Sequence, residues 1–121
     1  MSSNRSIIYE KSCIFALAVI RCYKDEFSAD YADLFKQLLR SGTSIGANLA
    51  EATTAISKVE FSAKVSIAYK EIRETQYWLL LLKESGLLKP ASYLKLNESV
   101  DELGRMAFSI LKTTGRVRTD H

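Results

Sequence analysis

One apolar pattern constrains the fold of this chain more than any other feature of its sequence. Between residues 61 and 82, apolar or small residues recur at alternating steps of four and three positions. The row comprises Phe61, Val65, Ala68, Ile72, Thr75, Leu79 and Leu82. Because these steps place every member on one face of an α-helix, the row predicts a long helix with one continuous buried face.

Three further segments have helical spacing, so we predict an all-α protein. The expected helices cover about residues 7–24, 31–56, 58–85 and 91–113. Ser57 and Glu60 have the spacing of a capping box, Gly86 suits a helix end, and Pro90 suits a first turn. Long amphipathic helices joined by short loops pack as antiparallel neighbours. The prediction is a single up-down-up-down four-helix bundle over residues 1–121, with a basic tail at 115–121.

The second and fourth helices have rows of their own. In the second helix the expected buried row is Leu34, Leu38, Ser41, Ile45, Asn48 and Ala52. In the fourth helix it is Leu96, Val100, Leu103, Ala107 and Ile110. Gly42 and Gly46 are each unfavourable inside a helix by about 1 kcal/mol relative to alanine. With Ala50 they form a row of small residues, which either lets another helix approach closely or marks a kink.

The rare residue types exclude several classes of site. The one histidine, His121, is the last of 121 residues, which disfavours a zinc site or a histidine-based catalytic centre in the core. Cys13 and Cys22 are nine positions apart and would point to opposite sides of one helix, too far apart for a disulfide. We therefore expect a reduced, cytoplasmic protein without a metal, a cofactor or a small-molecule substrate. No apolar run has the length of a membrane span.

Two stretches of the chain resemble a known bacterial family. They are LLRSGTSIGANLAEA at residues 38–52 and SIAYKEIRETQYWLLLLK at residues 66–83. Both are similar to the four-helix-bundle family named after the 23S rRNA intervening-sequence protein, and the similarity extends over about residues 7–115. The motif residues in this chain are Arg40, Ser41, Gly42, Ser44, Gly46, Asn48 and Glu51. Many relatives have proline at the position of Gly46, so their local backbone geometry is not transferred to it.

The resemblance implies more about structure than about function. It implies a four-helix bundle that assembles as a homopentamer, in a family without an established biochemical activity. Some members are encoded within insertions in the large-subunit rRNA gene. A distant relative, the accessory variability protein of diversity-generating retroelements, is a basic pentamer that binds nucleic acid and a reverse transcriptase.

Polar side chains near the expected seams have a structural interpretation. Asn48 lies in the seam of the second helix, where a buried amide needs a hydrogen bond, and Thr75 or Gln76 is the expected partner. A ligand-binding role for Asn48 is the alternative. Glu71 and Glu74 lie one turn apart, with Glu51 on the preceding helix. Paired carboxylates can act as acid and base, but the interleaved lysine and arginine favour ion pairs, either solvated or between subunits.

The end of the third helix is apolar around its whole circumference. A helix of an isolated bundle needs only one apolar stripe. The surplus residues Tyr77, Trp78 and Leu81 therefore indicate a subunit interface. The alternative is a helix end that is buried within one chain.

Basic residues gather late in the chain, although the net charge is only +3. They are Arg105, Lys112, Arg116 and Arg118. In a ring oligomer they would form a basic rim that contacts RNA phosphates. The alternative is a last helical turn that complements the helix dipole, followed by a frayed tail. No base-stacking platform is evident beside this charge.

Arg116 and His121 have the Arg-x4-His spacing of the HEPN type of helical ribonuclease. Such spacings arise often by chance, and these two residues follow Gly115 in the expected tail. The sequence therefore predicts a non-enzymatic, self-assembling adaptor or structural protein. The alternative function is an RNA-binding accessory factor that acts through a basic surface of a ring oligomer.

Overall fold

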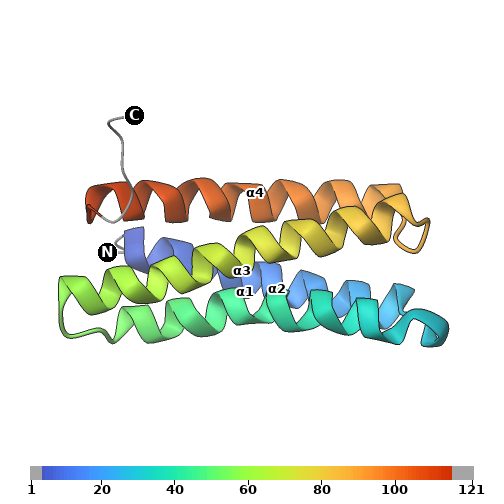
Figure 1. The fold of residues 1–121 in the computed structure, drawn as a ribbon, viewed down its shortest axis with the longest axis horizontal. Helices are drawn as coiled ribbons and strands as arrows, with labels where there is room; N and C mark the ends of the chain where they lie inside the picture. Colours follow the sequence, from blue (N-terminus) through green and yellow to red (C-terminus); the bar gives the residue numbers. More distant parts are fainter. Residues whose placement is uncertain (1–3, 116–121) are drawn as a thin grey trace.

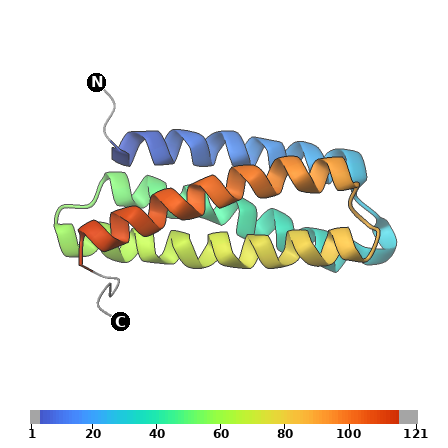
Figure 2. The same ribbon diagram turned by 90° about the horizontal axis from the view of Figure 1, so that it is seen from above.

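The computed structural model describes residues 4–115, with side chains from residue 7 onward, as four long helices joined by short turns (Figure 1). The helices are α1 (Asn4–Glu26), α2 (Ala32–Thr53), α3 (Lys58–Glu84) and α4 (Pro90–Thr113), and a 3-10 turn, η1 (Ala29–Tyr31), precedes α2. The chain reverses at every turn, as an up-down-up-down bundle requires (Figure 1). Helices that are consecutive in the chain pack together, and α1 also packs on α4, which runs at an angle to it (Figure 2).

The apolar row of α3 is buried throughout, which confirms the strongest sequence prediction. The other rows need correction at three positions. Leu34 and Asn48 are only half-buried in α2, and Phe35 and Leu49 fill the core instead. In α4, Leu111 is buried in place of Ile110. A helix has 3.6 residues per turn, so its buried face drifts away from a strict row with a period of 3.5.

The helix ends agree closely with the expected turn chemistry. The Ser57 hydroxyl accepts a hydrogen bond of 3.0 Å from the Glu60 amide, as in a capping box, but the Glu60 carboxylate reaches the Ile56 amide at 3.5 Å. Gly86 follows α3 with a φ of 78°, which glycine adopts without strain.

Two helix ends differ from the prediction. The second helix ends at Thr53 rather than at residue 56, because the chain is extended at Ser57, the residue before α3. The first helix continues through Glu26, where we expected a loop.

The glycines of α2 allow α1 to approach closely. A Cβ at Gly42 would lie 3.1 Å and 3.2 Å from the two methyl carbons of Val19, and one at Gly46 would lie 3.2 Å from the Ser12 hydroxyl oxygen. Val19 and Ser12 are both buried on the inner face of α1. The two glycines are therefore explained by close helix packing within one continuous helix.

Both cysteines are free thiols, as we expected. Burial raises the pKa of Cys22 to about 11, so this thiol stays protonated at neutral pH.

None of the four helices, as far as the structure describes them, is long and apolar enough to cross a membrane.

Candidate functional site

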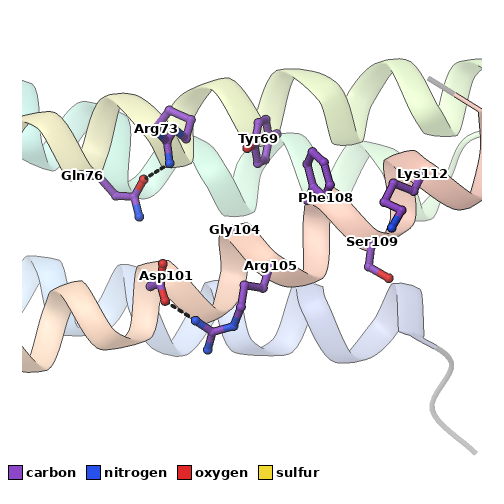
Figure 3. Close-up of a pocket in the computed structure, with 9 residues that line it drawn as sticks. All are labelled: Tyr69, Arg73, Gln76, Asp101, Gly104, Arg105, Phe108, Ser109 and Lys112. Carbon is purple, nitrogen blue, oxygen red and sulfur yellow. Dashed lines mark hydrogen bonds and ion pairs between the residues drawn. The ribbon is translucent and has the colours of Figure 1, made fainter. Parts of the chain in front are cut away.

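A groove of about 400 Å³ lies between α3 and α4 on the outside of the bundle (Figure 3). Its α3 wall is formed by Tyr69, Arg73 and Gln76. Its α4 wall is formed by Asp101, Gly104, Arg105, Phe108, Ser109 and Lys112. The volume falls in the range of small-ligand sites, although the groove is open to solvent along its length.

The floor of the groove is Gly104. A Cβ at this position would lie 3.4 Å from a methyl carbon of Ile72, so the backbone of α4 lies against the Ile72 side chain of α3 here. Tyr69 of α3 and Phe108 of α4 lie next to each other beside this floor, with ring centroids 6.0 Å apart and planes inclined by 46° (Figure 3). Phe108 is 39% exposed. The pair is therefore an aromatic surface that solvent can reach.

Basic side chains surround the aromatic pair. Arg73 donates a hydrogen bond of 3.1 Å to Gln76, and Arg105 pairs with Asp101 one turn before it on the same helix. Lys112 forms no ion pair with any residue that the structure describes. The lining thus carries three cations against one carboxylate, and the groove favours an anion with a flat, apolar part.

Two of the four predicted basic residues, Arg105 and Lys112, line this groove. Arg116 and Arg118 lie outside the described residues, as does the Arg116–His121 spacing. Sequence reasoning missed Arg73, Tyr69 and Phe108. The aromatic pair escaped notice because its members are 39 positions apart on different helices, and no local motif joins them.

A family model described as 23S rRNA-intervening sequence protein matches residues 4–109. The chain belongs to this family. A crystal structure of a protein with unknown function from the S23 ribosomal protein family of Bacteroides thetaiotaomicron is similar, with 37% sequence identity and a TM-score of 0.84. The match covers 91% of this chain and 99% of that chain. No protein with a curated description matches. Neither matching description names an enzymatic activity.

In this member of the 23S rRNA-intervening sequence family, several motif residues of α2 bond to side chains of α3. Arg40 forms ion pairs with Glu71, at 3.4 Å, and with Glu74. Ser41 and Thr75 share a hydrogen bond of 3.0 Å in the core, and Glu51 pairs with Lys64 at 2.9 Å. These contacts tie the two helices together at two levels along their length, one around Arg40 and Ser41 and the other at Glu51.

Asn48 does not make the contact that we predicted. Its amide nitrogen donates to the Ser44 carbonyl oxygen of the same helix at 2.9 Å, and Ser44 itself donates to the Arg40 carbonyl at 2.6 Å. Thr75 is bonded to Ser41 instead. The amide of the half-buried Asn48 side chain is satisfied by a backbone carbonyl one turn earlier in its own helix, so it needs no partner on α3.

The carboxylates of α3 are held by cations and by an indole. Trp78 donates a hydrogen bond of 2.9 Å to Glu74, and this bond together with the Arg40 guanidinium lowers the pKa of Glu74. Glu74 is therefore ionised at neutral pH, as an ion-pair partner should be. Within residues 4–115, no group of histidine, cysteine or acidic residues could hold a metal ion.

The exposed apolar residues of the family member are not quite those we predicted. On α3, Tyr77 is 54% and Leu80 44% exposed, whereas Trp78 and Leu81 are half-buried within the chain. On α1, Ile14 is 68% and Leu17 52% exposed. The sequence contained a signal for the α1 residues, because that helix is apolar nearly all round.

Proposed function

We propose that this protein is a non-catalytic bundle in the cytoplasm that assembles with copies of itself into a ring. The observation that carries the proposal is the outer face of α1, where Ile14 and Leu17 are both more than half exposed. These two residues are three positions apart and share the side of α1 away from its buried row. Large apolar side chains grouped on an exposed face are typical of protein interfaces.

A closed ring needs two different patches on each subunit, because each contact joins the front of one copy to the back of the next. The chain has a second exposed apolar patch on another helix, formed by Tyr77 and Leu80 of α3. We propose that the α1 patch of one copy packs on the α3 patch of the next. Five copies is the number that the family resemblance implies.

The first prediction concerns the mass of the particle in solution. We expect the wild-type protein to have five times the mass of one chain by size-exclusion chromatography with light scattering. The double variant Ile14→Glu, Leu17→Glu should be monomeric, because burying two carboxylates at a contact is strongly unfavourable. Leu94→Glu is the matched control: Leu94 is equally exposed, on α4, and its substitution should leave the mass unchanged.

A mixing experiment tests the two-patch arrangement. Tyr77→Glu, Leu80→Glu should also be monomeric, since it removes the other patch. Equal amounts of the two double variants should form a dimer, because each retains the patch that the other lacks. A monomeric wild-type protein at tens of micromolar would refute self-assembly, and a mixture that stays monomeric would refute the pairing of α1 with α3.

We also propose nucleic-acid binding as a second candidate function. The observation that favours it is the position of Arg105 and Lys112, which line one groove together with Arg73. A ring would repeat this basic surface around its circumference. Binding by phosphate contacts weakens steeply as salt is added, because bound counterions are released.

The second prediction is that a single-stranded RNA binds the full-length protein in 50 mM salt and dissociates by 300 mM. Changing Arg105, Lys112, Arg116 and Arg118 together to glutamine should reduce the salt dependence as well as the affinity. Fluorescence anisotropy with a labelled oligonucleotide measures both. Salt-independent binding, or binding that the fourfold variant retains, would contradict this function.

A further inference from the structure

We propose that the groove between α3 and α4 is a nucleotide site of a single-stranded nucleic acid, in which a base stacks on Phe108 beside Tyr69 and the flanking phosphates contact Arg73 and Lys112. The inference rests on the second candidate function and adds the ligand class and the residues that hold it. It uses a surface separate from the exposed patch of α1.

The aromatic pair supplies a surface on which a base can stack, which basic side chains alone do not provide. Bases of a single strand have free faces, and stacking on an exposed aromatic ring is a common way for proteins to hold them. In a duplex these faces are covered by neighbouring base pairs. The exposed ring of Phe108, in a groove that Gly104 lines without a side chain, therefore suits an unpaired base.

The cations flank the aromatic pair on both sides. Arg73 lies one helical turn from Tyr69 on α3, and Lys112 lies one turn from Phe108 on α4, in the opposite direction along the groove (Figure 3). Each separation of four residues corresponds to about 6 Å along the helix. A ligand with a phosphate on either side of a base matches this order, which favours a strand over a free mononucleotide.

Arg105 can also contact a phosphate of the strand, although it is paired with Asp101 in the free protein. Its partner Asp101 is on the same exposed helix face, and the side chains are 68% and 51% exposed. Exposed ion pairs of this kind are weak, so a phosphate can replace the carboxylate. Asp101 is the one acidic residue among those lining the groove and should oppose binding.

The test measures binding of a fluorescein-labelled oligo(U) 12-mer to the full chain in 50 mM salt. Phe108→Leu, which keeps an apolar side chain but removes the ring, should weaken binding about tenfold. Lys112→Gln should weaken it severalfold and lower the slope of log affinity against log salt by about 0.7. The matched controls, Tyr31→Leu and Lys36→Gln, change exposed residues away from the groove and should bind like wild type.

A variant that is expected to strengthen binding serves as a control, because loss of folding could only weaken it. Asp101→Asn should tighten binding twofold or more, whereas Asp33→Asn on α2 should not change it. Circular dichroism and light scattering should show an unchanged fold and mass for Phe108→Leu. A change in its mass would show that the groove is a subunit contact and would overturn the inference.

Two further outcomes separate the inference from the function on which it rests. If oligo(U) binds but Phe108→Leu and Asp101→Asn have no effect, the groove site is wrong and binding by charge alone survives. If no oligo(U) binds in 50 mM salt, both fail. Uridine monophosphate tests whether the site holds a strand or a free nucleotide. We expect no binding of uridine monophosphate at micromolar concentration. Binding that depends on Phe108 at this concentration would show a site for a free nucleotide and would overturn the strand proposal.

Discussion

Replacement of Gly42 by leucine is expected to destabilise the bundle by about 3 kcal/mol, the largest effect of any single change proposed for this chain. Even a Cβ at this position would lie 3.1 Å from a methyl carbon of Val19, which is fully buried. A leucine side chain must therefore push α1 away from α2. Thermal or urea unfolding followed by circular dichroism measures the loss.

Two companion variants show whether close packing is the cause. In the Val19→Ala background the obstructing methyl groups are absent, so Gly42→Ala should add stability by about 1 kcal/mol through helix propensity. In the wild-type background the same change should gain nothing. Gly104→Ala is the control in α4, where the nearest atom lies at the ordinary distance of 3.4 Å, and it should stabilise the protein by about 0.5 kcal/mol. A Gly42→Leu protein that unfolds like wild type would contradict the close approach of the helices.

Removal of the Glu26 side chain, as in Glu26→Ala, is expected to cost about 2 kcal/mol of unfolding free energy. The carboxylate stands at the end of α1 and accepts a hydrogen bond of 2.8 Å from the Lys89 amide, which precedes α4, and another from the Ser92 hydroxyl. Lys89 has no side-chain cap of its own. A carboxylate also interacts favourably with the positive end of the α4 dipole. Glu26 therefore acts as the cap of α4, although Lys89, the residue that precedes this helix, is 63 positions away from it in the chain.

The effect should be local as well as global. Amide hydrogen exchange in the first turn of α4 should accelerate in Glu26→Ala before exchange in the core of α3 does. Glu26→Gln, which keeps an acceptor but loses the charge, should have an intermediate stability. Asp25→Ala is the matched control, because Asp25 is exposed beside Glu26, and it should change stability by less than about 0.5 kcal/mol. Equal effects of the Asp25 and Glu26 changes would contradict the capping role.

The fold was predictable because burial imposes a period on the sequence. The row from Phe61 to Leu82 is regular, since α3 packs on both α2 and α4 and has one deep face. Turn residues act over a few positions and are equally readable, as Ser57 and Gly86 show. Both kinds of signal are local, and local signals determine where helices form.

Contacts between helices were less predictable, because they depend on how far one helix is shifted along the next. The periodic rows leave that shift undetermined. For this reason Thr75 is hydrogen-bonded to Ser41 and not to Asn48 as predicted. For the same reason the sequence predicts a loop at Glu26, although this residue caps α4. Two of the three basic residues of the candidate groove, Arg105 and Lys112, were visible as a cluster in the sequence. Arg73 and the aromatic pair were not, because they join this cluster only when α3 and α4 bring Tyr69 and Phe108 together.

The order of the helices has a consequence for how the chain reaches this structure. Most helix contacts join elements that follow one another in the chain, and the contact between α1 and α4 is the exception. Topologies with mainly local contacts fold fast, because little chain entropy is lost before each contact forms. The seam between α1 and α4 closes the longest loop of the chain, so we expect it to form last. We therefore expect the Glu26 cap to slow the opening of the bundle rather than to speed its formation.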